Sequence, residues 1–209
     1  MKIILKILLV AAIGALIYMC VQSITTPINF DKEQKERERA IVERLIEIRK
    51  AQIGYRNRVG SFAGSFEDLQ KFLNEDRIPF LAKEGELTDE QLKSGMTEQE
   101  AVNKGLIRRD TTWILAKDTL LSPNYDVASL GKVPGFESHK FSIDTTTLTS
   151  PSGYVVPVFE CGVLYDVYLG DMNRQLLINQ KDKMTKLGRY LGLRVGSVTE
   201  INNNAGNWE

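Results

Sequence analysis

The chain has few of the residue types that most catalytic and metal sites require. Its 209 residues include one histidine, His139, and two cysteines, Cys20 and Cys161. A Ser-His-Asp triad would depend on His139, which has no nucleophile-elbow motif nearby, and a zinc site would lack ligands. Cys161 has no second cysteine after the N-terminal apolar run, so a disulfide within that part is excluded. We therefore expect no catalytic residue, no metal and no cofactor.

The chain also lacks an excess of charge of either sign. Lys and Arg together number 27, as do Asp and Glu, so the formal net charge is zero. Without a basic block there is no electrostatic basis for nucleic acid as a partner, and neither of the usual glycine-rich phosphate-binding motifs occurs. Carboxylates remain the only acid–base option, and Glu160, Asp166 and Asp171 flank or interrupt apolar stretches. Solvent-facing and turn-capping roles explain these three residues more simply than glycoside hydrolysis does.

The chain does contain one long apolar run near the N-terminus. Ile7 to Val21, ILLVAAIGALIYMCV, is uncharged, and twenty helical residues rise about 30 Å, the thickness of a bilayer core. The run predicts a transmembrane signal anchor over residues 1-27, closed by Pro27. Two alternatives are a cleaved signal, with Val21-Gln22-Ser23 as the cleavage triplet, and a lipoprotein modified at Cys20.

The charges at the two ends of this run bear on its orientation. Lys2 and Lys6 precede it, and four basic residues beyond Pro27 are interleaved with four acidic ones. A strict count of positive charges places the large domain inside the cell. Short N-terminal runs of this kind most often export the domain on their C-terminal side. We therefore expect a single-pass inner-membrane protein, in contact with bilayer lipid, whose main domain is periplasmic.

A stalk helix is predicted over residues 28-57. Asp31 with Gln34 reads as an N-cap box, and the polar first turns, DKEQKERERA, predict a solvated spacer. An apolar stripe comes next at 4-3-4-3 spacing, made of Ile41, Leu45, Ile48, Gln52 and Tyr55. A strict seam would favour self-association or an envelope partner, whereas the flanking Val42, Ile46 and Ile53 favour a helix lying on a sheet. The five stripe residues are the candidate interaction surface.

Residues 58-105 predict an insert of short helices. Gly54 and Gly60 break the stalk, and Ser65 with Asp68 begins a helix over FEDLQKFLNE whose Phe66, Leu69, Phe72 and Leu73 face one way. Thr88 with Gln91 and Thr97 with Glu100 are two further capping boxes.

Residues 106-209 predict an antiparallel sheet domain with one helix. Strands are expected between Leu106 and Leu121 and over 140–149, 154–161, 163–169 and 193–199, and a helix from Asp171 through Leu187. Pro157 favours an edge or a bulge in its strand. The sum of helix, helical insert and antiparallel sheet is an α+β fold.

The stretch from Ile41 to Leu73, IVERLIEIRKAQIGYRNRVGSFAGSFEDLQKFL, resembles the segment of type IV pilins and type II secretion pseudopilins in which the long helix ends. That resemblance implies a membrane helix continuing into an amphipathic helix over an antiparallel sheet. No acidic residue lies between Ile3 and Val21, where a prepilin carries a glutamate. The whole chain, with its end NNNAGNWE, also resembles membrane-anchored proteins of Bacteroidota.

Three functions fit these patterns to different degrees. The first is a non-enzymatic envelope protein that serves assembly, secretion or scaffolding through its stalk. The second is a periplasmic peptide- or glycan-binding accessory domain, with edge strands and the insert from Lys83 to Gly105 as its surfaces. The third is a hydrolase that uses Asp or Glu. The lack of catalytic groups and the continuity of span and stalk favour the first.

Overall fold

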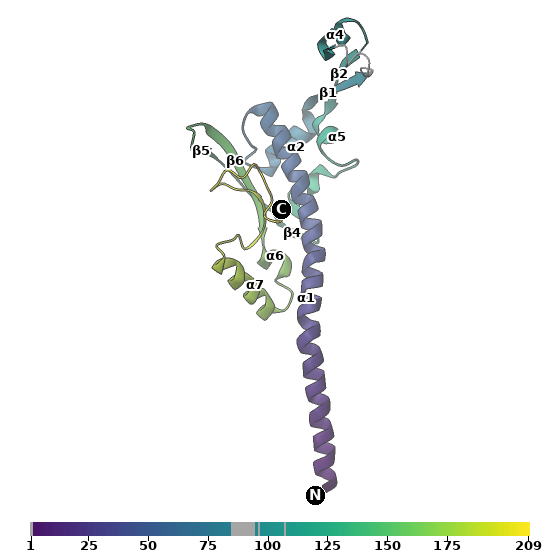
Figure 1. The fold of residues 1–209 in the computed structure, drawn as a ribbon, viewed down its shortest axis with the longest axis vertical. Coiled ribbons are helices and arrows are strands. Elements are labelled where there is room, and N and C mark those ends of the chain that lie inside the picture. The colour runs from purple at the N-terminus through teal and green to yellow at the C-terminus, as the bar shows by residue number, and fades with distance from the viewer. Residues whose placement is uncertain (1, 85–94, 96, 107) are drawn as a thin grey trace. The chain divides into compact units, whose positions relative to one another are not determined.

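The α+β class is confirmed by a computed structural model, which describes residues 2–84, 95, 97–106 and 108–209 (Figure 1). The chain forms two compact units, named unit 1 (Met1–Arg49 and Gly131–Glu209) and unit 2 (Lys50–Leu130). This division differs from the segmentation that composition suggested, because the stalk and the region after residue 106 both contribute to the two units. The predicted capping box at Thr88 and Gln91 lies outside the described residues.

One helix, α1 (Lys2–Val59), contains both the apolar run and the predicted stalk. Pro27, which was expected to close the span, lies inside this helix and does not end it. Proline removes only the hydrogen bond to the carbonyl four residues earlier, and the long regular segments on either side outweigh that local loss. Gly54 is also inside α1 and does not break it. A Cβ at Gly54 would collide with the side chain of Leu120, so glycine at this position permits α5 to lie close to α1.

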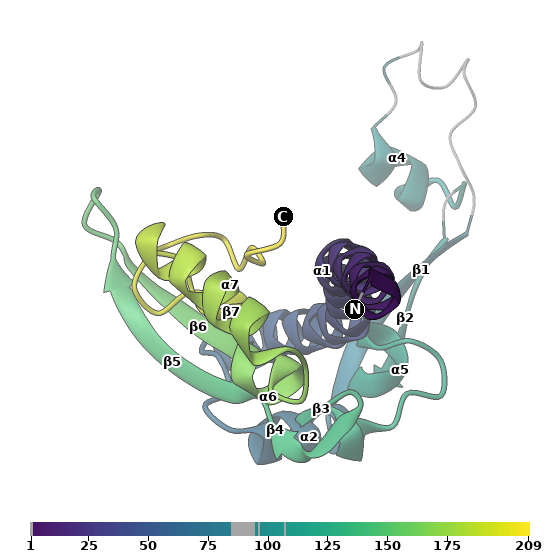
Figure 2. The same ribbon diagram turned by 90° about the horizontal axis from the view of Figure 1, so that it is seen from below.

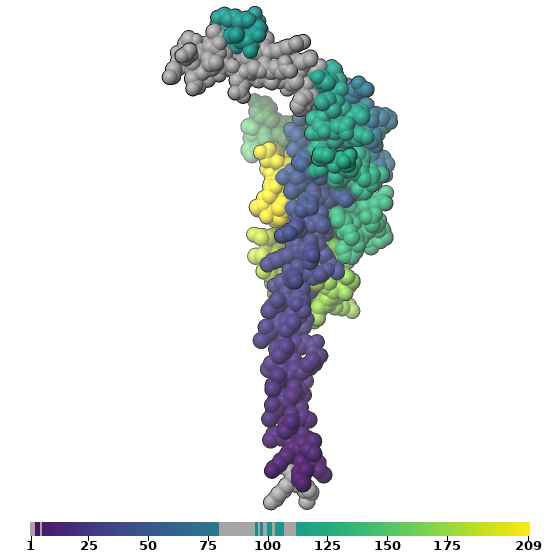
Figure 3. Space-filling model, turned by 90° about the vertical axis from the view of Figure 1, so that its right-hand side faces the viewer, coloured from purple at the N-terminus to yellow at the C-terminus, as the bar shows by residue number. Residues whose placement is uncertain are grey.

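The N-terminal part of α1 has no cover within unit 1. Figure 3 shows this purple segment standing free, and the large apolar side chains that the structure describes in it are exposed. In the part of the chain that the structure describes, α1 is the one helix long and apolar enough to cross a membrane. These features are compatible with a single-pass membrane anchor.

Unit 1 is built on a three-stranded antiparallel sheet in the order β5-β6-β7. Its strands are β5 (Ser142–Thr149), β6 (Val155–Leu164) and β7 (Gly192–Gly196), preceded by a short ladder of β3 (Lys132–Val133) and β4 (Phe136–Lys140). The central strand β6 carries the most buried side chains, including Phe159 and Cys161. Pro157 lies in this central strand, but only β5 pairs with that stretch, because β7 pairs with Glu160 to Leu164 alone. The proline therefore sits where β6 is locally an edge.

Two short helices come after β6 in unit 1. The predicted strand over 163–169 is wrong, because β6 ends at Leu164 and α6 (Tyr165–Leu169) begins. An apolar run of this length does not distinguish a strand from one turn of buried helix. The next helix, α7 (Arg174–Lys186), is capped by Asn173, whose side chain accepts from the backbone N–H groups of Gln175 and Leu176. The prediction that Asp171 caps this helix is wrong.

Unit 2 contains α2 (Phe66–Glu75), the hairpin of β1 (Arg77–Glu84) and β2 (Arg108–Leu115), and the turns α4 (Glu98–Asn103), α5 (Ala116–Leu120) and η1 (Val127–Ser129). The predicted helix over FEDLQKFLNE is confirmed, with the four expected apolar residues buried. The Thr97–Glu100 capping box is confirmed by reciprocal bonds of 3.3 Å. The strand β1, which contains Pro79, was not predicted, because proline argues against a strand.

The N-cap of α2 gives a stability test for unit 2. The hydroxyl of Ser65 accepts from the Asp68 N–H at 3.1 Å, which satisfies one of the free donors of the first turn. Replacing Ser65 with Ala is expected to lower the free energy of unfolding by about 1 kcal/mol. Denaturant unfolding followed by circular dichroism measures this loss. Ser61→Ala, an exposed serine outside any helix, is the control and should stay near the parent; equal losses for both variants would contradict the cap.

Candidate functional site

The five residues of the predicted interaction stripe are not a free surface. Ile41, Leu45, Ile48 and Gln52 have no exposed area, and Tyr55 is half-buried. Gln52 is accommodated because its amide makes two 2.9 Å hydrogen bonds with the backbone N–H and carbonyl of Ala63. Tyr55 meets Phe72 edge-on with ring centres 5.4 Å apart. These residues are buried within the chain itself, which favours the alternative of a helix packed against its own domain over a free surface for partner binding or self-association.

The polar turns before the stripe are mostly exposed, as a solvated spacer requires, but Arg37 and Glu38 on one face of them contact the rest of unit 1. Arg37 donates to both carboxylate oxygens of Asp171, at 2.6 and 3.0 Å, and to the Tyr168 carbonyl at 2.6 Å. The Tyr168 hydroxyl donates to Glu38 at 3.2 Å. The hydrogen bond from Arg37 lowers the pKa of Asp171, and burial raises the pKa of Tyr168. A charged turn of α1 and the α6–α7 connection are thus joined by a two-pronged ion pair.

The three carboxylates considered for acid–base chemistry each have a basic partner. Glu160 pairs with Arg194 at 2.9 Å, Asp166 with Lys181 at 2.6 Å, and Asp171 with Arg37 at 2.6 Å. A general acid near neutral pH needs a raised carboxyl pKa, whereas that of Asp171 is lowered. Structural ion pairing accounts for these residues.

The C-terminal tail forms an ordered site that no prediction from the sequence included. Asn203 and Asn204 adopt left-handed backbone conformations, and the tail then returns along β7, where Gly206 bridges Val195. The Asn207 amide donates to the Gly192 carbonyl at 2.9 Å and accepts from the Arg194 N–H at 3.1 Å. Asn207 therefore substitutes for a neighbouring strand and covers an edge that would otherwise be open.

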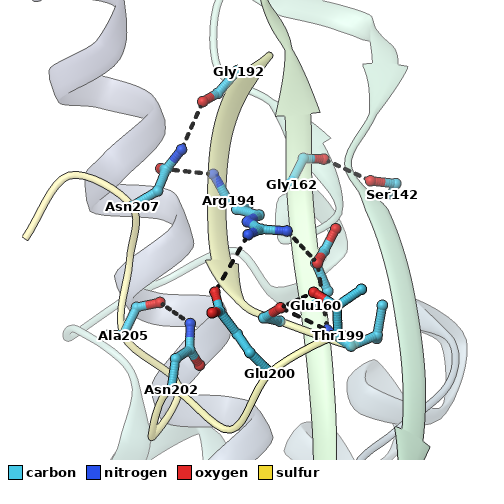
Figure 4. A network of polar contacts seen from close by, with 12 residues as sticks. Ser142, Glu160, Gly162, Gly192, Arg194, Thr199, Glu200, Asn202, Ala205 and Asn207 are labelled. Atoms are coloured by element: carbon cyan, nitrogen blue, oxygen red, sulfur yellow. Dashed lines mark hydrogen bonds and ion pairs between the residues drawn. The ribbon is translucent and has the colours of Figure 1, made fainter. Parts of the chain in front are cut away.

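A polar network links this tail to the sheet. Figure 4 shows Arg194 between Glu160, at 2.9 Å, and Glu200, at 3.7 Å. The Arg194 guanidinium also lies 5.2 Å from the ring centre of Tyr190. Burial raises the pKa of Tyr190. The guanidinium is fixed by charge on two sides and by an aromatic ring.

Beside this network, unit 1 has a cleft of about 490 Å³. Its walls come from α1, α6, α7, β7 and the tail, and they combine aromatic rings with planar polar groups. The lining side chains include Gln34, Glu38, Tyr165, Arg189, Tyr190 and Trp208. A cleft of this size and composition suits a small or segmental ligand held by ring faces and hydrogen bonds.

The end of the tail is tied to α1 by an ion pair that titrates. Arg49 donates to Glu209 at 2.6 Å, and this hydrogen bond lowers the pKa of Glu209. In Figure 3 the yellow tail lies against α1, in agreement with that contact. Because the folded-state pKa is depressed, the pair stabilises the docked tail above the ordinary glutamate pKa of about 4.3. That stabilisation is lost as the pH falls through the lower folded-state value.

We expect the tail to loosen in acid. With Trp113→Phe, Trp208 is the sole tryptophan, and its fluorescence anisotropy should fall between neutral pH and about pH 3, below the ordinary glutamate value. Glu209→Gln in the same background should show the lower anisotropy already at neutral pH. A transition of the same size in Glu209→Gln would contradict this assignment.

The remaining candidate residues are Cys161 and His139. Cys161 is buried, and that burial raises the pKa of its thiol, whereas His139 is exposed beside Ser138. Within the described residues, no three His, Cys, Asp or Glu side chains are grouped so as to hold a metal ion. No protein-family model, curated protein or solved structure matches the chain.

Two sequence signals could have pointed to the tail site. Asparagine tolerates left-handed backbone better than most residues, so a run of three before Ala-Gly indicates a sharp reversal. A tryptophan directly after such a reversal indicates that the returning segment packs against something. Neither signal names the residues on β7 and α7 that complete the cleft, because these are distant in sequence.

Proposed function

We propose that this chain is a non-enzymatic, single-pass envelope protein whose extracytoplasmic domain is a glycan-binding accessory module. The observation that carries the proposal is the cleft beside the tail, where the partly exposed rings of Tyr190 and Trp208 lie among amide, carboxylate and guanidinium groups. Flat aromatic faces suit the apolar faces of sugar rings, and planar polar groups suit their hydroxyls. The ion pairing of the candidate carboxylates supports binding without hydrolysis.

The membrane part of the proposal is supported by the continuity of α1. The apolar segment and the buried stripe belong to one helix, so anchor and domain are mechanically one element. A membrane helix whose second half packs into a domain with an antiparallel sheet is also what the resemblance to pilins implies. Assembly or scaffolding through the stalk stripe is not proposed, because that stripe is buried.

Trp208 offers a direct test, with the full chain in detergent micelles. In Trp113→Phe, whose sole tryptophan is Trp208, N-acetylglucosamine oligomers should shift or quench the emission in a saturable way. Trp208→Phe, which retains only the exposed Trp113, is the matched control and should not respond. Arg189→Ala should weaken the response. Saturation by an unstructured peptide but not by the oligomers would replace glycan with peptide, and no response to either would reject the binding module.

A further inference from the structure

The folded part of unit 1 begins very near the end of the apolar run of α1. Phe30 is 6% exposed although Ile28, two residues earlier, is 60% exposed. The run ends at Ile24, and six helical residues rise about 9 Å. The head-group layer on each side of a bilayer is about 5 to 7 Å thick. If α1 spans the bilayer, the side chains packed on Phe30 therefore lie beside the head groups.

The helix α7 lies on the side of unit 1 that faces the N-terminal end of α1. Figure 2, which is viewed from that end, shows α7 unobscured and lying across the view. Its position is fixed because Asp171, three residues before Arg174, is held by both Arg37 bonds. The rigid helix that crosses the membrane thus also sets the height of α7 above it.

The exposed surface of α7 is basic in a chain whose net charge is zero. Residues 174–189 contain five basic side chains and one acidic one, Asp182. Lys181 is paired with Asp166, and the other four basic residues are exposed: Arg174, Lys183, Lys186 and Arg189. Between them lie Ile178 and Leu187, which are 41% and 56% exposed. Basic side chains gathered close to a membrane span are attracted to anionic lipid head groups.

We propose that α7 docks on the anionic phospholipid head groups of the same bilayer that α1 crosses. The three exposed cations of α7 itself, Arg174, Lys183 and Lys186, would face lipid phosphates, and Ile178 would approach the head-group boundary. Charge complementarity selects anionic lipid as the occupant, because a neutral surface offers these cations nothing. The contact would fix the rotation and tilt of unit 1 on the membrane, which a single helix alone leaves free.

A fluorophore at position 178 tests the docking. The full chain carrying Cys20→Ala and Ile178→Cys is labelled with an environment-sensitive dye, since Cys161 is buried and stays unlabelled. The protein is reconstituted into phosphatidylcholine vesicles with and without phosphatidylglycerol, with a quencher attached to the lipid head groups. We expect strong quenching only with phosphatidylglycerol, and its loss near 1 M salt, where the screening length is about 3 Å.

Charge variants identify the groups responsible. Lys183→Gln and Lys186→Gln should each lower the ratio of docked to undocked protein about 5-fold. Lys140→Gln is the matched control, because Lys140 lies farther from the membrane. The backbone carbonyl of its strand partner Lys132 accepts a hydrogen bond from Arg44, which is two helical turns farther along α1 than Arg37. Circular dichroism confirms that each variant is folded. Equal quenching in both lipids, or quenching unchanged by the α7 variants, would overturn the proposal. Neither result depends on glycan binding.

Discussion

Replacing Leu45 with Ala is expected to lower the free energy of unfolding by about 2 to 5 kcal/mol. Leu45 is fully buried in the stripe of α1, so truncation removes apolar contacts and leaves a cavity. Unfolding of the full chain in detergent, followed by circular dichroism over a denaturant series, measures the loss. Leu187→Ala is the matched control, since Leu187 is more than half exposed and the same truncation should cost less than about 0.5 kcal/mol there.

The same variant separates two interpretations of the stripe. If Leu45 belonged to a docking surface for another protein, Leu45→Ala would leave the stability of the isolated chain near that of Leu187→Ala and would weaken a complex instead. A stability loss without any change of oligomeric state is the result expected of a core residue. Size-exclusion chromatography with light scattering on both variants supplies the second measurement.

Gly196→Ala is expected to destabilise unit 1 by about 2 to 4 kcal/mol, from a left-handed backbone penalty of about 1 kcal/mol and an overpacking cost of about 1 to 3 kcal/mol. Gly196 ends β7 with φ of +71°, and a Cβ there would collide with the backbone carbonyl of Phe159 on β6. A backbone atom in a paired strand cannot move aside as a flexible side chain can. The alanine must therefore push β6 and β7 apart or displace the tail that bonds to residue 196.

Gly188→Ala is the control for this prediction. Gly188 has a similar φ of +62°, but a Cβ there meets nothing within 4 Å. Its loss should be limited to the conformational part, about 1 kcal/mol. The difference between the two unfolding free energies measures the collision alone, and equal losses would show that β6 and β7 accommodate the extra atom. Trp208 anisotropy in the Trp113→Phe background would report whether the tail is released in Gly196→Ala.

Local patterns were sufficient for elements whose signals are short-range. The Ser65 cap with its four apolar residues and the Thr97–Glu100 box both depend on contacts within a few positions. Alternation likewise placed β5, and the two-residue period is decisive where one face is covered. The helix over 165–169 was missed because an apolar run carries no period that distinguishes a buried strand from a buried turn.

Pro27 and Asp171 show why residue types typical of helix ends mislead when they are interpreted alone. A proline near the end of a span is a common stop, yet α1 continues because regular helix on both sides stabilises it. Asp171 precedes a helix and has a capping side chain, yet Asn173 caps and Asp171 pairs with Arg37, 134 positions away. An ion pair between residues that far apart in the sequence produces no local sequence pattern.

By itself, the sequence determined that this chain carries a membrane-length apolar helix, has an α+β fold, and holds a stripe on α1 that must be covered. Hydrophobicity and its period suffice for these conclusions because they concern which side chains leave water. Only the tertiary structure decided that the stripe is buried within the chain itself, that the charged turns of α1 hold the α6–α7 connection, and that the tail, α7 and β7 enclose a cleft. Those outcomes depend on contacts between side chains that are far apart in the sequence, and composition and local spacing do not predict such contacts.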